Sequence, residues 1–389
     1  MDTKKIINLE KKFLMPTYSR SEIAIESGTG CYVLDKDGNR YIDLVGGLAT
    51  CLLGHGNKKF AKAVQKQASK ITNPTNLYYT EEQVKLAERL ARLSGLSKCF
   101  FSNSGTEGVE AAIKLTRKHA KKIEIIAAKN GFHGRTFGSL AATGKDKIKK
   151  PFEPMLAGFK HIDYGDASFF EKSITKNTAA IIVEPIQGEA GIIVPPEEYL
   201  KHLREICNKN NVLLIIDEIQ TGCGRTGKFF AFEHEKIRPD IVVLAKGLAN
   251  GIPIGATIAR DEIAQSFEKG DHGSTFGGNP VACAAANFTL DYITKNKLIQ
   301  NAEITGKYFF ESIRGIKSKA IKEIRGRGLM IGVELNKKGN EIVKKCLNQG
   351  LLVNCANENV LRFLPPLIIN KEIVRKSMII LSEVLENEN

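Results

Sequence analysis

The stretch Ile241-Val242-Val243-Leu244-Ala245-Lys246-Gly247-Leu248-Ala249-Asn250-Gly251 places a single lysine directly after a run of apolar residues. An uninterrupted run of this kind is typical of a strand that is buried on both faces of a sheet. A lysine at the end of such a strand either extends its ammonium to solvent or holds it in a partly dry site. In a dry site its lowered pKa would allow Schiff-base chemistry, so Lys246 is a candidate catalytic residue.

Apolar runs alternate with helical patterns through the middle of the chain. The predicted strands cover residues 99–101, 123–128, 179–184, 212–217, 241–245 and 254–260, and predicted helices such as 108–119 and 196–210 lie between them. This alternation predicts an α/β fold with a mostly parallel central sheet. A hairpin is predicted within residues 30–44, and a helix at 281–295 leads to a smaller α+β unit that begins near residue 300.

Composition argues against several classes of protein. Of the 389 residues, 42% are hydrophobic, which is ordinary for a globular protein. No apolar run approaches the roughly 18 residues of a membrane span, and the charged segment Met1–Lys12 does not resemble a signal peptide. The eight cysteines form no CxxC pair and the seven histidines no metal-binding spacing, so we expect a cytoplasmic protein with reduced thiols and no metal site.

The net charge of +14 raises the question of nucleic-acid binding. The basic residues are spread along the chain, with no run of five, and no aromatic residues are interleaved with them as a base-stacking surface requires. We therefore expect no nucleic-acid partner, and interpret the excess as a lysine-rich surface that favours anionic substrates.

Polar motifs follow the predicted strands, where an open α/β sheet places its binding site. Ser102–Gly108 could hold a phosphate at a helix start, and residues 273–280 offer further hydroxyl and amide groups. Gly131–Arg135 contributes an aromatic ring and an arginine, and Glu184–Glu189 a carboxylate. With the acid Asp217 and the amine of Lys246, this edge of the sheet could hold a phosphorylated pyridine aldehyde.

Simpler interpretations exist for two of these motifs, and a further stretch resembles a different functional motif. Ser104 and Glu107 have the spacing of a helix capping box. Asp217 could be buried in an ion pair with an arginine. Residues 222–229 nearly match a nucleotide-binding P-loop but have Phe229 where that motif needs a serine or threonine, so we do not expect an ATPase.

Together, in order, six motifs resemble those of the class III pyridoxal-phosphate aminotransferases. They are SNSGTE (102–107), GFHGR (131–135), EPIQGE (184–189), DEIQTGCGRTGKFFAFEH (217–234), LAKGLANGIPIGA (244–256) and STFGGNP (274–280). The resemblance implies the fold-type-I architecture of pyridoxal-phosphate-dependent transferases, with a large cofactor-binding domain at 51–287 and a small domain at 288–389 that residues 1–50 join.

The resemblance also implies roles in binding pyridoxal phosphate. Lys246 would be the covalent attachment point, Asp217 would pair with the pyridinium nitrogen, and Phe132 would stack on the ring. The implied cofactor-binding positions are Gly105, Thr106, Phe132, Asp217, Glu218, Ile219, Gln220, Lys246 and Thr275.

For the substrates, the resemblance implies that Arg135 binds the carboxylate of the amino donor and Arg362 the α-carboxylate of glutamate, with Glu189 neutralising Arg362 in the other half-reaction. Ser274 and Thr275 would reach substrate or phosphate from a neighbouring subunit, which implies a homodimer with shared active sites.

Within the class, the chain is most similar to the branch that transfers the δ-amino group of N2-acetyl-L-ornithine to 2-oxoglutarate in arginine biosynthesis. Enzymes acting on ornithine, succinylornithine, succinyl-diaminopimelate or 4-aminobutyrate share these motifs and stay open as alternatives, as does a 2,1-aminomutase. A basic binding protein on an inactive scaffold is the non-enzyme alternative, which the combination of Lys246, Asp217 and Arg135 disfavours.

Overall fold

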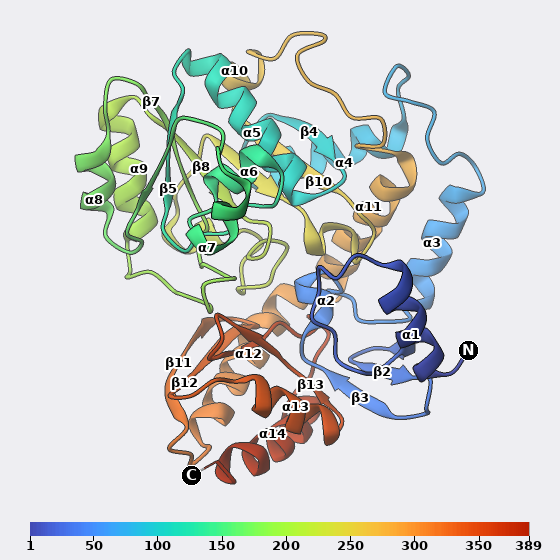
Figure 1. The fold of residues 1–389 in the computed structure, drawn as a ribbon. Helices are drawn as coiled ribbons and strands as arrows, with labels where there is room; N and C mark the ends of the chain where they lie inside the picture. The colour runs from blue at the N-terminus through green and yellow to red at the C-terminus, as the bar shows by residue number, and fades with distance from the viewer. Residues whose placement is uncertain (389) are drawn as a thin grey trace.

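A seven-stranded sheet forms the centre of the structure, a computed structural model that describes residues 1–388 (Figure 1). Its order is β4 (Lys98–Ser102), β10 (Gly255–Ala259), β9 (Ile241–Leu244), β8 (Leu213–Asp217), β7 (Thr178–Val183), β5 (Glu124–Ala128) and β6 (Phe159–Ile162). Strand β10 runs antiparallel to both neighbours, and the pairs from β9 to β6 are parallel. The predicted mostly parallel α/β sheet is therefore confirmed.

Both faces of this sheet are buried, as the apolar strand at 241–244 predicts. Ile241 and Val243 pack in one cluster with Val109 and Ile113 of helix α5 (Gly105–Ala120). The alternate residues of the strand belong to a second cluster that contains residues of α8 (Ala167–Ser173), α9 (Tyr199–Asn210) and α11 (Pro280–Lys295). Because side chains alternate along a strand, only a run that is apolar throughout satisfies both clusters.

Every strand that the sequence predicted in this sheet is present within about two residues of its expected limits. Strand β6 was missed because Lys160 and His161 interrupt its apolar pattern and all four of its residues are only half-buried. The remaining elements of the large part are α3 (Lys58–Ala68), α4 (Glu81–Ser94), α6 (Phe137–Ala142), α7 (Asp146–Lys149), α10 (Asp261–Ala264) and the short 3-10 turns Lys150–Phe152, Ala231–Glu235 and Lys246–Ala249.

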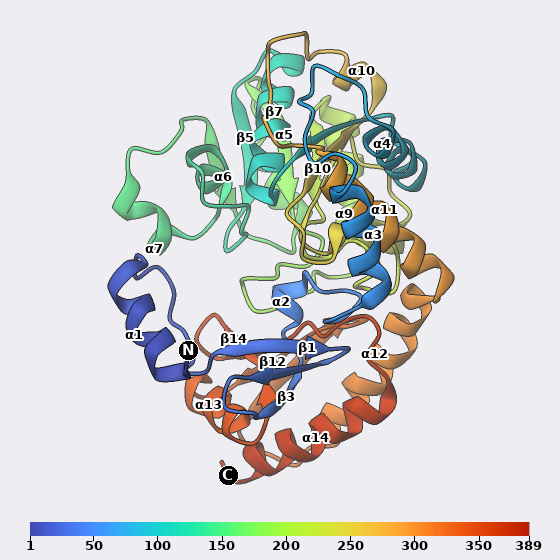
Figure 2. The same cartoon turned by 90° about the vertical axis from the view of Figure 1, so that its right-hand side faces the viewer.

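The two ends of the chain form the lower part of the molecule (Figure 2). One sheet has the order β1 (Ile25–Thr29), β2 (Tyr32–Asp35), β3 (Arg40–Asp43) and β13 (Leu351–Leu352); the other has β11 (Ile321–Arg327), β12 (Met330–Leu335), β15 (Val360–Phe363) and β14 (Asn354–Ala356). Helices α1 (Thr3–Phe13), α2 (Gly46–Ala49), α12 (Leu298–Arg314), α13 (Asn340–Asn348) and α14 (Lys371–Glu386) complete it. Since β3 pairs with β13, residues near 40 and near 350 share one sheet; domain limits at 50 and 287 remain our proposal.

The loop that resembles a P-loop connects these parts instead of starting an α-helix, because only a 3-10 turn follows it. Its Arg225 is fully buried and donates hydrogen bonds to the carbonyl oxygens of Leu329 and Pro365, at 3.1 and 2.5 Å. Burial lowers the pKa of Arg225 to about 9. The arginine therefore ties the large part to the strand-bearing C-terminal part.

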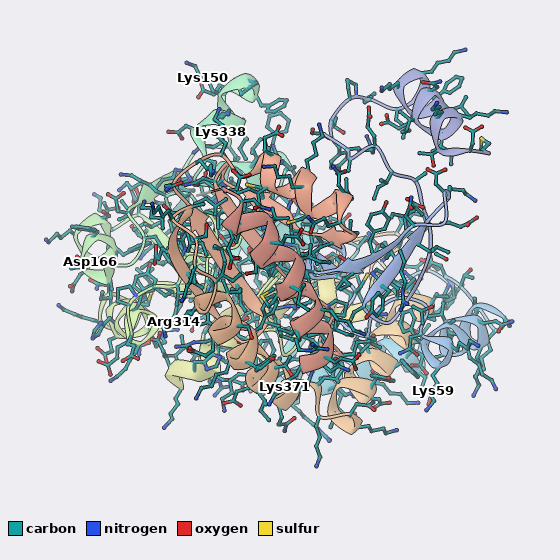
Figure 3. All side chains as sticks on the ribbon, turned by 90° about the horizontal axis from the view of Figure 1, so that it is seen from below. Lys59, Lys150, Asp166, Arg314, Lys338 and Lys371 are labelled. Atoms are coloured by element: carbon teal, nitrogen blue, oxygen red, sulfur yellow. The ribbon has the colours of Figure 1, made fainter. Side chains whose placement is uncertain are left out.

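The surface carries its charge in a dispersed way. Lys59, Lys150 and Arg314 lie far apart from one another in Figure 3. Through residue 388, no helix is both long and apolar enough to cross a membrane.

An ion pair holds the first sheet against the segment that enters the large part. His55 Nε2 lies 2.7 Å from Asp43 Oδ2, while Asp43 Oδ1 accepts the backbone N–H groups of Val45 and Gly46. The carboxylate of Asp43 raises the pKa of His55 to about 10, from 6.5 in the unfolded chain.

We expect the stabilisation from this pair to be complete below about pH 6.5, where His55 is protonated in both states, and to vanish as the pH rises to about 10. Urea unfolding of the wild type and of His55→Gln should therefore differ at pH 6 by about 1–3 kcal/mol and converge at pH 10. A difference that stays constant with pH would show that the contact acts through packing alone.

Candidate active site

Five parallel-running strands end at one edge of the central sheet, and each is followed by one of the polar motifs. The loops after β4, β5, β7, β8 and β9 begin at Asn103, Lys129, Glu184, Glu218 and Ala245. Antiparallel β10 begins at the same edge, where a Cβ on Gly255 would lie 2.3 Å from the carbonyl oxygen of Ser104. The fold therefore gathers the predicted site residues of the large part at one edge of the sheet.

Lys246 has a strained backbone and a perturbed amine. Its φ of +42° lies in the left-handed region, which is costly for a residue with a side chain and occurs chiefly at functional sites. Burial lowers the pKa of the Lys246 ammonium, and Arg362 lowers it further, against the opposing effect of Glu189. A lysine with a lowered pKa is a better nucleophile and proton carrier near neutral pH.

Asp217 is buried against a histidine and not, as one interpretation of the sequence had it, against an arginine. Its Oδ2 lies 2.7 Å from Nδ1 of His133, and its Oδ1 accepts the backbone N–H of Ile219 at 3.0 Å. Burial lowers the pKa of His133, but Asp217 outweighs burial and raises it above the usual value. His133 Nε2 is buried without a hydrogen-bond partner in the described part of the chain.

Helix α5 begins with a tight polar turn. Ser104 Oγ accepts the N–H of Glu107 at 3.3 Å, but the Glu107 carboxylate accepts the N–H of Asn103 instead of closing the capping box on Ser104. A Cβ on Gly105 would meet Ile219 Cδ1 at 2.6 Å, so the helix start lies directly against the loop after β8. The first N–H groups of a helix, together with its dipole, favour an anion at this place.

Thr106 connects this helix start to the loop after β5. Its Oγ1 lies 2.5 Å from Ser139 Oγ and accepts the N–H of Arg135 at 3.2 Å. Arg135 is exposed, and its guanidinium lies 5.6 Å from the centroid of the Phe132 ring. The aromatic ring, the arginine and the helix start therefore form one surface.

Glu184 fixes the loop that carries Phe132. Its carboxylate accepts the N–H of Phe132 at 2.9 Å and that of Gly188 at 3.1 Å. Burial raises the pKa of Glu184 to about 7.

The C-terminal part contributes one arginine to this site. Arg362 of β15 is buried, and its Nη1 lies 2.6 Å from Oε1 of Glu189. Its Nε and Nη2 donate to Asn354 Oδ1 at 3.0 and 2.8 Å. Gln220 Nε2 is 3.5 Å from the same Glu189 oxygen. Burial raises the pKa of Glu189, but Arg362 and then Lys246 outweigh it and hold that pKa below its ordinary value.

Three of the predicted positions lie at the margin of this group. The carboxylate of Glu218 is fully buried and accepts hydrogen bonds from Thr221 and from the N–H of Phe232. Ser274 Oγ accepts a hydrogen bond from Asn103 Nδ2 at 3.2 Å, beside the start of α5. Thr275 is exposed, and its carbonyl accepts a hydrogen bond from Asn73.

Sequence reasoning gave no role to His133, Glu184 or Asn354. His133 stands within the quoted motif GFHGR and Glu184 within EPIQGE, so their positions were visible but their partners were not. Asn354 follows the short strand β13, and nothing in its local pattern pointed to Arg362.

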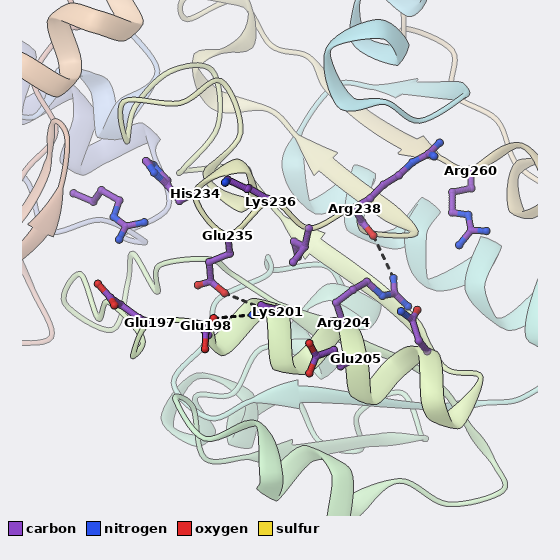
Figure 4. Close-up of a pocket in the computed structure, with 13 residues that line it drawn as sticks. Glu197, Glu198, Lys201, Arg204, Glu205, His234, Glu235, Lys236, Arg238 and Arg260 are labelled. Carbon is purple, nitrogen blue, oxygen red and sulfur yellow. Dashed lines mark hydrogen bonds and ion pairs between the residues drawn. The ribbon is translucent and has the colours of Figure 1, made fainter.

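A separate surface cavity of about 880 Å³ lies over α9 and the turn Ala231–Glu235 (Figure 4). Some of its charged groups are paired with each other or with neighbours: Lys201 with Glu198 at 2.7 Å, and Arg204 with Asp240 at 2.7 Å. None of the predicted site residues lines this cavity.

The residues at the sheet edge fit pyridoxal phosphate. They supply a helix start for the phosphate, a buried carboxylate for the pyridinium nitrogen, an aromatic ring and an amine of lowered pKa. The described residues contain no group of histidine, cysteine and acidic side chains that could hold a metal ion.

Residues 15–385 match the family model described as aminotransferase class III. The chain belongs to this family. It is therefore a transaminase, and class III enzymes generally depend on pyridoxal phosphate.

Individual relatives extend over the whole chain. The chain is 46% identical to the acetylornithine aminotransferase of Methanothermobacter thermautotrophicus, with all of both chains covered. It is 47% identical to that of Caldanaerobacter subterraneus, covering 98% of this chain and 99% of the relative.

Solved structures agree with this family. An ornithine aminotransferase from Toxoplasma gondii has a TM-score of 0.97 at 33% identity, covering 100% of this chain and 97% of its own. An acetylornithine aminotransferase from Elizabethkingia anophelis has a TM-score of 0.89 at 33% identity, with 99% of both chains covered. These structures confirm the α/β fold with its mostly parallel sheet.

Asp217→Asn should lower kcat by about 100-fold or more, because the variant keeps the shape of the side chain but removes the charge that we expect opposite the pyridinium nitrogen. His133→Phe should have the smaller effect of about tenfold, since it removes only a hydrogen bond to that carboxylate. Steady-state assays on holoenzymes with equal cofactor content provide the measurement. An Asp217→Asn enzyme of normal turnover would contradict the assigned role.

Proposed function

We propose that this class III transaminase transfers the δ-amino group of N2-acetyl-L-ornithine to 2-oxoglutarate, giving N-acetyl-L-glutamate 5-semialdehyde and L-glutamate. Full-length relatives that are 42–47% identical and named acetylornithine aminotransferase support this substrate. The geometric observation that carries the proposal is the closed pair of Glu189 and Arg362 beside the open Arg135.

That observation favours a donor whose carboxylate is remote from the reacting amine. While Glu189 neutralises Arg362, the buried end of the site does not attract an α-carboxylate, and Arg135 is an exposed cation that could hold a more distant one. For glutamate and 2-oxoglutarate, whose carboxylate adjoins the reacting carbon, Arg362 would become the partner once Glu189 moves away.

In this proposal the residues of the chain hold pyridoxal phosphate at the sheet edge. Gly105 and Thr106 would bind the phosphate, Phe132 and Ile219 would lie on the ring, and Asp217, held by His133, would keep the ring nitrogen protonated. Gln220 would lie near the phenolic oxygen. The bound cofactor supplies an electron sink and carries the amino group between the two half-reactions.

Lys246 would move the proton. Once the substrate amine has displaced it from the cofactor, its Nζ would accept a proton from the substrate carbon as general base. It would then give that proton to the cofactor carbon as general acid. The lowered pKa of this amine suits both steps near neutral pH. The left-handed backbone of Lys246 would keep Nζ at the site between the two proton transfers.

A second candidate is ornithine δ-aminotransferase activity, which the TM-score of 0.97 with the Toxoplasma gondii enzyme favours. The two substrates differ by an acetyl group, which removes the positive charge of the α-amine. A free α-ammonium held by its carboxylate at Arg135 would lie close to that guanidinium and be repelled.

We also propose that the enzyme is a homodimer that covers an exposed apolar loop. Leu77 is 84% exposed, and the next two residues of its loop, Tyr78 and Tyr79, are exposed too. Phe276, in the neighbouring loop, is also exposed. Asn76 Nδ2 donates to the carbonyls of Ser274 and Gly277 at 3.0 and 2.9 Å, so the two loops form one surface (Figure 2). A second copy on this surface would place its Thr275 near the partner's site.

The substrate can be tested by single-turnover absorbance, with holoenzyme and no keto acid. N2-acetylornithine should bleach the yellow cofactor band at least about tenfold faster than ornithine, because Arg135 repels the free ammonium. Lys246→Ala should bleach with neither compound and should form no covalent cofactor adduct. Faster bleaching with ornithine would transfer the protein to the ornithine branch.

The double variant Leu77→Asp/Tyr79→Asp should be monomeric by sedimentation velocity and should lose most of its activity, because buried carboxylates without partners would destabilise the proposed interface. Ile379→Asp, an equally drastic change at an exposed residue of α14, should remain dimeric. If the double variant in this loop remained dimeric, the dimer interface would have to lie elsewhere on the surface.

A further inference from the structure

Lys145 brings a further ammonium group to the site from the segment after α6. The residue is half-buried, and its Nζ donates a hydrogen bond to the carbonyl oxygen of Glu189 at 2.7 Å. Its backbone is fixed because the preceding Gly144 exchanges hydrogen bonds with Gly131 and Asn130, at the start of the loop that carries Phe132. The ammonium therefore reaches Glu189 from a backbone segment that is fixed by hydrogen bonds.

This lysine belongs electrostatically to the substrate site. Burial lowers the pKa of Lys145, and Arg362 and Arg135 lower it further, while Glu189 and Glu184 oppose them. The groups that act on Lys145 thus include the pair of Glu189 and Arg362, here called the glutamate switch, and Arg135 of the proposed donor site.

Arg362 has at most one spare N–H group, on Nη2, while Glu189 is in place. Its Nε and Nη2 are bound to Asn354, and its Nη1 to Glu189 Oε1 and to the carbonyl oxygen of Gly188. A carboxylate can bind Arg362 through two parallel hydrogen bonds only if the Glu189 side chain leaves it. That side chain is 30% exposed, so the departing carboxylate would lose an ion pair in a partly buried place.

We infer that Lys145 receives the Glu189 carboxylate when 2-oxoglutarate or glutamate occupies Arg362. Its Nζ is already held at the main chain of Glu189, so rotation of that side chain alone brings the carboxylate to the ammonium. The main-chain hydrogen bond keeps the loop in place during the exchange. Lys145 is therefore a positioning residue that acts through Glu189 and touches neither substrate.

The other polar groups around Glu189 are poorer acceptors of its charge. Gln220 is neutral and lies 3.5 Å away, and Lys246 is committed to the chemistry. Arg135 lies on the Phe132 side of the site. Lys145 supplies a full charge that is close, fixed and not otherwise used.

The inference rests on the proposed function and predicts a split between the two substrates. In Lys145→Met the KM for 2-oxoglutarate should rise about fivefold, since the open state of the switch loses one ion pair. The KM for N2-acetylornithine should stay within about twofold, because the closed pair of Glu189 and Arg362 serves that half-reaction. Lys147→Met, which removes an exposed ammonium two residues away, is the matched control and should change neither value.

A double-mutant cycle separates this role from a general effect on the fold. In a Glu189→Ala background, Lys145→Met should change the KM for 2-oxoglutarate no further. A Lys145 effect that persists without Glu189, or an equal rise in both KM values, would overturn the inference. A rise for N2-acetylornithine alone would also overturn it, since Lys145 would then bind the donor itself.

Binding of glutarate, a dicarboxylate that cannot react, gives a readout independent of turnover. Titration calorimetry on the holoenzyme should show about fivefold weaker glutarate binding in Lys145→Met and no change in Lys147→Met. If the wild-type enzyme fails to use N2-acetylornithine but Lys145→Met still binds glutarate more weakly than the wild type, the proposed donor is wrong and the switch stands. Unchanged glutarate binding with normal donor turnover would reject the switch alone.

Discussion

Burial of both faces of the central sheet is the constraint on which the rest of the structure depends. Strands that are apolar throughout leave no polar side chain within the layers, so polar groups collect where the strands end. Parallel strands bring those ends to one edge, and five separate loops meet there. The position of Lys246 follows from this constraint, because the lysine is the second residue beyond the buried strand Ile241–Leu244. Its left-handed backbone lies at the start of a short turn whose next three residues, Gly247–Ala249, are buried.

Charge balance at this edge comes from pairs that cross between elements. Asp217 lies against His133, and Arg362 from the C-terminal part lies against Glu189 from the loop after β7. A buried charge is costly on its own. Within each pair, each charge lowers the free-energy cost of burying its partner. Arg225 has no acidic partner among the described residues but is held by two main-chain carbonyls of the C-terminal part. The two parts of the molecule are therefore joined both beneath the site and within it.

Much of this arrangement could be predicted from the sequence, for identifiable reasons. Long apolar runs such as Ile241–Leu244 specify buried strands, and ordered motifs at their ends specify which loops meet. The short strand Phe159–Ile162 was missed because its polar residues obscure the pattern. The partner of Asp217 was also missed, since a contact between residues 133 and 217 depends on strand order and not on local spacing. Asn354 was missed for the same reason, as its contact with Arg362 depends on the pairing of β14 with β15.

Backbone shape does not by itself decide the amino donor. At the same 33% identity, the Toxoplasma gondii ornithine aminotransferase matches this chain with a higher TM-score, 0.97, than the Elizabethkingia anophelis acetylornithine aminotransferase, 0.89. Two enzymes named for different donors thus share one backbone frame with this chain. Discrimination between donors would then come from groups that the frame leaves free. Arg135 is exposed, lies over Phe132 and forms no ion pair within the described residues, so under the proposed function its charge would favour an acetylated amine over a free ammonium.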